Sequence, residues 1–288
     1  MPCEAEPLFK RALTIYETAL GPERRDVASG LGNLADLYNA QGRYSETEPL
    51  LKRVLAILEK ALGPNHRDVA VALNGLALHY LAQGRHPEAE PLLKRALGIV
   101  EKALGPEHRD VASALTSLTE LYRAQGRHGE AEPLIKRALA IREKALGPDH
   151  PDVAASLNYL ALLALSQRNW AQAADFWRRA TEIIARRAER DHGTSEGGSL
   201  KGEAVQNGWY FSGLVKMTDR LAPQERDRAR LGKEMFETAQ WAQASVAASS
   251  LAQMAAPRSP APSLRPWPRC KPRLVPMKRW WCFSALPN

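Results

Sequence analysis

Apolar side chains between residues 26 and 62 recur at the spacing of one face of an α-helix, i, i+3, i+4 and i+7. Two such stripes follow one another. The first consists of Leu31, Leu34, Ala35 and Tyr38. The second consists of Leu51, Val54, Leu55 and Leu58. The pattern predicts two amphipathic helices, helix A over residues 26–41 and helix B over residues 45–62, each burying its apolar face.

Local signals predict where each helix ends. Helix A is followed by Gln41-Gly42-Arg43, and Gly42 is free to adopt the positive φ of a helix C-terminus. Helix B is followed by Gly63, a stop, and by a proline that cannot continue the helix. Pro49 falls near the first turn of helix B, where a missing N–H is least costly.

The same two helices return with a fixed period. Leu-Gly-Pro occurs at residues 20–22, 62–64, 104–106 and 146–148, 42 residues apart each time. Gln-Gly-Arg occurs at residues 41–43, 83–85 and 125–127, and Glu-x-Glu-Pro at residues 4–7, 46–49, 88–91 and 130–133. Three independent markers in one phase predict an all-α solenoid, in which stacked helix pairs bury a continuous core that no single pair could bury alone.

The polar face of helix B carries Lys-Arg doublets at residues 52–53, 94–95 and 136–137. Each lysine follows a glutamate by four residues, as Lys52 follows Glu48, which is the favourable orientation of a helical ion pair. Because acidic residues match the basic ones in number, we interpret this face as a solvated, self-paired surface. A basic stripe for nucleic acid is the alternative interpretation.

The stretch "ALAIREKALGPDHPDVAASLNYLALL", residues 138–163, closely resembles the 42-residue tetratricopeptide (TPR) repeats of kinesin light chain and its bacterial relatives. The resemblance covers residues 3–190. It implies a TPR-type α-solenoid, a right-handed superhelix of antiparallel helix pairs. It also implies a concave groove, lined by helix A of each pair, that holds a peptide or a partner helix.

The array has atypical ends. The first predicted helix, residues 3–20, is a helix B without its helix A, so we expect either that the true start lies upstream or that this helix is a crude cap; we favour the first. In the fourth unit Arg168 replaces the turn glycine, and Trp170 and Trp177 enter. An atypical last repeat is typical of a cap.

Three further segments are predicted after the solenoid. Residues 191–200 are rich in glycine and small polar residues and read as a flexible linker. Residues 201–256 predict two more helices and resemble the helical connector between TPR arrays and CHAT domains, which are caspase-like proteases with a His-Cys dyad. Residues 257–288 are too few for such a protease fold, so the resemblance implies a connector whose CHAT domain is missing.

The basic charge of the chain is confined to its last segment. The formal net charge is +8, yet residues 257–288 hold seven Lys/Arg and no Asp/Glu, which leaves 33 basic and 32 acidic residues in the rest. The segment is rich in Pro, Arg, Trp and Cys and has no helical period. We hypothesise that it is a frameshift product, with a disordered basic arm as the alternative, and the net charge then carries no functional meaning.

No pattern for catalysis or cofactor binding is found. Cys3, Cys270 and Cys282 lie in terminal segments without metal-site spacing. His66, His108 and His150 share one repeat phase, which explains them as helix-start residues. We see no phosphate loop, no paired carboxylates, no signal peptide and no membrane span. We therefore expect a cytoplasmic, non-enzymatic protein without cofactors, and neither nucleic acid nor a membrane as its partner.

The helical phase and the TPR resemblance together assign the inward positions of each helix A. In the first two units they are Ser29, Gly32, Asp36 and Asn39, then Val71, Asn74, Leu78 and Leu81. In the last two they are Ser113, Thr116, Glu120 and Arg123, then Ala155, Asn158, Leu162 and Leu165. The absence of Lys argues against a clamp for a C-terminal carboxylate. We expect Asn74 and Asn158 to bond a peptide backbone, and Leu78, Leu81, Leu162 and Leu165 to receive an apolar anchor.

Three functional hypotheses follow. The first is a non-catalytic scaffold that binds a protein or peptide of unknown identity in the groove. The second is the regulatory arm of a CHAT protease system that has lost its catalytic domain. The third, a nucleic-acid or membrane module built on the basic tail, loses its basis if the tail is a frameshift product. The leucines of the groove could alternatively pack against helices that follow the array.

Overall fold

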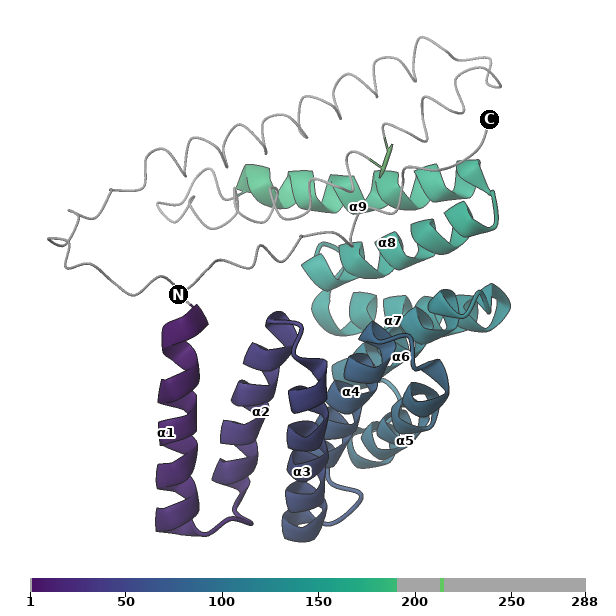
Figure 1. Ribbon diagram of the computed structural model, residues 1–288. Helices are drawn as coiled ribbons and strands as arrows, with labels where there is room; N and C mark the ends of the chain where they lie inside the picture. The colour runs from purple at the N-terminus through teal and green to yellow at the C-terminus, as the bar shows by residue number, and fades with distance from the viewer. Residues whose placement is uncertain (1, 191–212, 215–288) are drawn as a thin grey trace, which may run out of the picture. The chain divides into compact units, whose positions relative to one another are not determined.

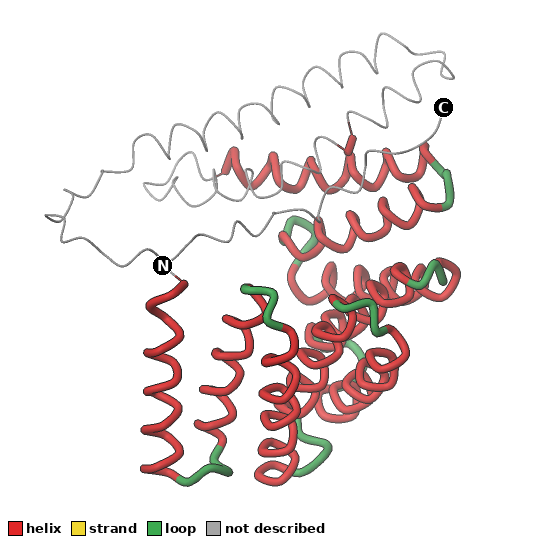
Figure 2. Tube along the Cα trace, in the orientation of Figure 1, coloured by secondary structure: helices red, strands yellow, loops and turns green. Residues whose placement is uncertain are grey.

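The computed structural model of the chain describes residues 2–190 and 213–214. These residues are helical apart from short turns, and no strand occurs among them (Figure 2). The helices are α1 (Pro2–Leu20), α2 (Arg25–Ala40), α3 (Tyr44–Leu62), α4 (Arg67–Ala82), α5 (His86–Leu104), α6 (Arg109–Ala124), α7 (His128–Leu146), α8 (Pro151–Ser166) and α9 (Trp170–Arg190). The predicted linker, connector and tail lie outside the described residues, except for Gly213 and Leu214.

The helices pack in the order of the sequence (Figure 1). Helix α2 pairs with α3, α4 with α5, α6 with α7 and α8 with α9, and each helix B also packs against helix A of the next pair. Helix α1 is a helix B, and it packs mainly on α2. The predicted all-α solenoid of helix pairs is therefore confirmed for the described residues.

The predicted helix ends agree with the structure to within a residue. Gly42 and Gly63 adopt φ values of 71° and 85°, as their positions after helices A and B require. In the last unit Arg168 takes the same left-handed conformation with φ 60°, which a residue with a Cβ adopts at a cost. Pro49 differs from the prediction. It is the sixth residue of α3, so the N–H it lacks belongs to the second turn and would have bonded the carbonyl of Ser45.

The repeated histidines cap helices. His66, His108 and His150 each accept a hydrogen bond at Nδ1 from the backbone N–H two residues on, at 3.1, 3.2 and 3.1 Å. The bond satisfies one of the donors that the start of a helix leaves without an intrahelical partner. Arg24 holds the same place before α2, and no side-chain cap forms there in the described structure. The interpretation of these histidines as helix-start residues is confirmed.

Two of the three sequence markers, Gln-Gly-Arg and Glu-x-Glu-Pro, meet with a tyrosine of helix A in one contact between neighbouring repeats, which we call the clamp. At the end of α4, the Tyr80 hydroxyl donates to Glu48 Oε1 at 3.0 Å. Arg85, in the next turn, donates to Glu48 Oε2 at 2.7 Å, and its guanidinium lies 4.2 Å from the centre of the Tyr80 ring. Glu48 belongs to helix B of the preceding repeat. One carboxylate thus joins a tyrosine, an arginine and the lysine of its own helix, Lys52.

The clamp recurs at the other repeat boundaries. Its members are Glu6, Tyr38 and Arg43, and then Glu90, Tyr122 and Arg127. In the last unit Ala164 and Asn169 stand in place of the tyrosine and the arginine, and the described contacts of Glu132 are with Lys136 and Gln167. The array is therefore held by one repeated contact that its last boundary lacks.

The Lys-Arg doublets of helix B are paired, as predicted. Each lysine bonds the glutamate four residues before it, at 2.6–2.8 Å. Each arginine reaches the preceding helix B, where Arg53 meets Glu17, Arg95 meets Glu59 and Arg137 meets Glu101. This surface is a ladder of ion pairs between repeats.

One buried contact breaks the repetition of the core. Leu58, Val100 and Ile184 are buried at equivalent positions of helix B, whereas the third unit has Arg142 there, 8% exposed. Arg142 Nη1 donates to Ser156 Oγ of α8 at 2.6 Å. The equivalent position in α2 is Gly30, and a Cβ there would come within 3.5 Å of the ring of Tyr16. At these two boundaries a large side chain of helix B thus meets a small residue of helix A.

Candidate interaction groove

The predicted groove residues fall into three exposure classes. Exposed are Ser29, Asp36, Val71, Leu78 and Ser113. Half-buried are Gly32, Asn39, Asn74, Leu81, Thr116, Glu120, Arg123, Ala155, Leu162 and Leu165. Asn158 alone among them is buried. Three hydroxyls bond carbonyl oxygens of their own helices, those of Ser29, Ser113 and Thr116.

A polar network joins α2 to α4 beside the predicted groove. His79 Nδ1 lies 2.8 Å from Asn39 Oδ1, and His79 Nε2 lies 2.6 Å from the amide nitrogen of Gln83. Since the asparagine oxygen can only accept, Nδ1 carries the proton and Nε2 accepts from Gln83. Burial lowers the pKa of His79 and reinforces this neutral tautomer.

His79 lies in helix α4 and was not among the candidate residues that the sequence pattern indicated. The equivalent residues of α2, α6 and α8 are leucines, and His79 itself is 2% exposed. Its ring also meets the edge of the Tyr44 ring, with centroids 5.7 Å apart. A histidine in a column of leucines was the signal that could have identified it from the repeat alignment.

Helix α4 presents an exposed apolar face. Val71 is 64% exposed and Leu78, two turns later, is 37% exposed. Leu81 is half-buried against the core. Of the aliphatic residues predicted to receive an anchor, Leu78 is the most accessible, whereas Leu81, Leu162 and Leu165 pack partly on the core.

The backbone between these side chains is open. A Cβ added at Gly75 in α4 or at Gly32 in α2 would meet no described atom within 4 Å. Asn74 Oδ1 is buried and has no hydrogen-bond partner among the described residues. An uncompensated buried acceptor favours a ligand that can donate to it.

The second half of the predicted groove is more enclosed. Burial raises the pKa of Tyr159 in α8, and the Glu120 carboxylate of α6 raises it further. Arg123 of α6 also acts on Tyr159 electrostatically. Asn158 Oδ1 accepts a hydrogen bond from Trp177 Nε1 of α9 at 2.9 Å. That oxygen is therefore engaged within the protein.

Trp177 also meets a residue beyond the array. A Cβ at Gly213 would come within 3.0 Å of the Trp177 ring, and the neighbouring Leu214 is 2% exposed and part of the same hydrophobic core. Leu214 was predicted as an apolar residue of the connector. Its burial identifies one contact between that segment and the last helix pair.

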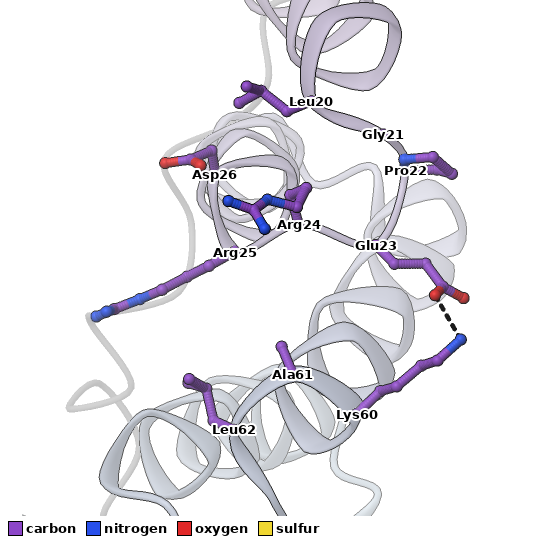
Figure 3. A pocket seen from close by; sticks show the side chains of 10 residues that line it. All are labelled: Leu20, Gly21, Pro22, Glu23, Arg24, Arg25, Asp26, Lys60, Ala61 and Leu62. Carbon is purple, nitrogen blue, oxygen red and sulfur yellow. Dashed lines mark hydrogen bonds and ion pairs between the residues drawn. The ribbon is translucent and has the colours of Figure 1, made fainter.

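A hollow of about 690 Å³ lies elsewhere, at the first Leu-Gly-Pro turn. It is lined by residues 20–26 of the turn and by residues 60–62 at the end of α3. Figure 3 shows the carboxylate of Glu23 and the ammonium of Lys60 facing one another as an ion pair at its side. None of the predicted groove residues lines it.

Two searches of the described residues bear on other functions. No group of three or more His, Cys, Asp or Glu side chains in residues 2–190 and 213–214 is arranged to hold a metal ion. Within the same residues, no helix combines the length and the apolar character needed to cross a membrane.

Comparison with known proteins agrees with this geometry. A sequence profile described as tetratricopeptide repeat matches residues 4–60, 26–102, 68–144 and 120–186. A putative kinesin light chain from Podosopora anserina, with nearly identical TPR-like repeats, is 29% identical; its structure superposes with a TM-score of 0.56 over 64% of this chain and 87% of that one. No match is found among curated proteins.

Two more distant structures share the fold. BtubC (BKLC) from P. vanneervenii, 19% identical, gives a TM-score of 0.64 over 95% of this chain and 94% of that one. The apo form of RapI, 14% identical, gives 0.52 over 84% and 90%. Since the tetratricopeptide repeat profile matches most of residues 4–186, the chain belongs to the tetratricopeptide repeat family.

Proposed function

We propose that the chain is a non-catalytic interaction scaffold that binds a peptide or a helix of another protein against helices α2, α4, α6 and α8. TPR repeats characteristically serve as protein-interaction scaffolds, so the family supports the general role. The observation that carries the specific proposal is the accessible apolar face of α4. Val71 and Leu78 are exposed there, although a solenoid buries most of its aliphatic residues between repeats.

The exposure of each groove residue determines which substitutions can test the proposal. Leu78 is exposed, so Leu78→Glu leaves the core intact, whereas Leu81 packs on the core and would confound binding with folding. Leu8 of α1, 66% exposed and outside the groove, provides the matched control Leu8→Glu.

The test selects peptides from a random phage-displayed library on the immobilised full chain. Affinities of the selected peptides are then measured by fluorescence anisotropy for the wild type, Leu78→Glu and Leu8→Glu. We expect Leu78→Glu to weaken binding at least about tenfold, because a charge replaces an apolar contact. Leu8→Glu should bind as the wild type does, and circular dichroism should show equal helicity in all three. Equal binding by Leu78→Glu would refute the proposal.

The second functional candidate, a regulatory arm of a CHAT protease system, rests on residues 201–256. The structure describes only Gly213 and Leu214 of that segment. It stays a hypothesis without a described contact that favours it over the scaffold.

A further inference from the structure

Asp36, Leu78 and Glu120 occupy equivalent positions on α2, α4 and α6, 42 residues apart. They form a row of acidic, apolar and acidic side chains across three successive repeats. No ion pair is formed by either carboxylate within the described residues, whereas the glutamates of the clamp and of the helix B ladder are paired. Asp36 is exposed, so its charge is available to a ligand.

Asp36 and Leu78 each lie within one turn of a contact that joins their helices. The hydrogen bond between Asn39 and His79 joins the two helices at 2.8 Å. Asn39 follows Asp36 by three residues, within one turn, and His79 directly follows Leu78. Packed helices lie about 8–10 Å apart, and an extended chain spans about 3.3 Å per residue, so a bound segment crosses from one helix to the next in about three residues.

The surface between them suits an extended chain. Val71 and Leu78 offer an apolar contact, and the open backbone at Gly32 and Gly75 permits a ligand main chain to approach closely. The unpartnered oxygen of Asn74, which lies between Val71 and Leu78 on α4, can accept from a ligand N–H.

The carboxylates of Asp36 and Glu120 indicate the charge of the partner. At Asp36 a lysine or arginine would find an unpaired acceptor. At Glu120 the attraction is weaker, because Arg123 lies one turn further along the same face of α6. Asp36, in the first repeat, therefore dominates the recognition of charge.

We propose that this half of the groove recognises an extended segment in which an aliphatic side chain, seated on Val71 and Leu78, lies about three residues from a lysine or arginine that pairs with Asp36. This inference rests on the proposed function. It adds the class of partner, a basic and aliphatic peptide.

The test uses the peptides selected on the full chain, and its variant is Asp36→Lys. Leucine occupies the equivalent position in α4 and α8, so this exposed position tolerates other residues. Glu182→Lys, on α9, makes the same change in net charge outside the groove and serves as the control. Affinities are measured by anisotropy at low and high salt.

We expect the selected peptides to carry a basic residue near an aliphatic one. Asp36→Lys should weaken their binding by about fivefold to tenfold at low salt and less at high salt, while Glu182→Lys leaves it unchanged. Peptides whose basic residue is replaced by glutamate should regain affinity for Asp36→Lys. This reciprocal rescue is specific to a direct pair and would not follow from a loss of folding.

The outcomes separate the two proposals. If no selected peptide loses affinity in Leu78→Glu, the proposed function fails and this inference fails with it. If binding depends on Leu78 but the peptides lack a basic residue, or Asp36→Lys binds them normally, the scaffold stands and the inference is overturned.

Discussion

The guanidinium of Arg127 lies 4.1 Å from the centre of the Tyr122 ring, and both side chains donate to Glu90 of the preceding repeat. Arg127 thus contacts the face of the Tyr122 ring and also binds the Glu90 carboxylate. The same carboxylate accepts a hydrogen bond from the Tyr122 hydroxyl. A cation over an aromatic face is attracted by the ring quadrupole, and a shared carboxylate fixes both donors in place. This unit holds one repeat against the next.

Tyr122→Phe should lower the free energy of unfolding by about 1 kcal/mol, because the hydroxyl bond to Glu90 is lost while the ring stays under Arg127. Urea denaturation followed by circular dichroism measures this. Tyr16→Phe is the control, since the Tyr16 hydroxyl has no described partner, and it should be neutral. Equal stability of Tyr122→Phe and the wild type would show that the hydroxyl contributes nothing.

Acid should loosen the repeats through the same glutamates. The bonds from Lys94 and Arg127 lower the pKa of Glu90, and those from Lys52 and Arg85 lower that of Glu48, in each case from 4.5 to about 2. Since the folded pKa lies below the unfolded one, the stabilisation is complete above pH 4.5 and is lost as pH falls toward 2. Glu90→Gln should flatten this loss in urea titrations at a series of pH values. An unchanged slope would mean that Glu90 does not titrate as described.

His79 should give a separate dependence at higher pH. Burial lowers its pKa from 6.5, so its stabilisation is complete above pH 6.5 and declines as pH falls below that value. Glu48, which favours the charged form, and Arg85, which opposes it, also act on the ring, and the Tyr44 and Tyr80 rings lie beside it. Asn39 and Gln83 fix the neutral tautomer.

His79→Leu supplies the residue found at the equivalent positions of α2, α6 and α8 and should remove this dependence. Thermal melts between neutral pH and pH 4.5 compare the two proteins. His79→Gln, which keeps a polar side chain but cannot be protonated, should also be insensitive to pH. A slope that persists in both variants would assign the effect to another histidine.

Arg142→Leu should stabilise the array by about 1 kcal/mol or more. Arg142 is buried where other repeats have aliphatic residues, and its described bond is to the neutral Ser156 hydroxyl. Replacing a buried charge by an apolar side chain of similar size is often stabilising. Ser156 retains its bond to the Asp152 carbonyl at 2.9 Å.

Arg137→Leu is the control for the change in charge, because Arg137 is partly exposed and paired with Glu101. It should be neutral or slightly destabilising in the same urea titration. A loss of stability in Arg142→Leu would show that the arginine makes a net favourable contact.

Local signals in the sequence account for most of the fold. Gly42, Gly63 and the equivalent glycines of the other repeats predicted the helix ends, because glycine adopts a positive φ readily wherever it stands. The clamp was not predicted, although its glutamate and its arginine belong to markers of the repeat, because it forms only when one repeat is placed against the next. Pro49 was expected near the first turn of helix B, and it is the sixth residue of α3, in the second turn.

The site was predictable only where the repeat itself sets the geometry. The helical phase separated Leu78, which is exposed, from the core, but it did not separate Leu81 and Leu162, which are partly packed. Asn158 was expected to face a ligand, and its oxygen bonds Trp177, which replaces the leucine or isoleucine found at the equivalent positions of α3, α5 and α7. Residues that break the period are set by tertiary contacts that the period cannot show.

The clamp gives the array a unit of growth. Because Glu6, Glu48 and Glu90 are held by the same two kinds of side chain, an in-frame loss or duplication of one period brings together a glutamate and an equally suited tyrosine and arginine. Unequal recombination within such a gene can thus lengthen or shorten the solenoid without a new interface. Helix α9, the last helix of the described residues, has Ala174 at the position of the glutamate, so the same contact cannot form between α9 and a unit placed after it.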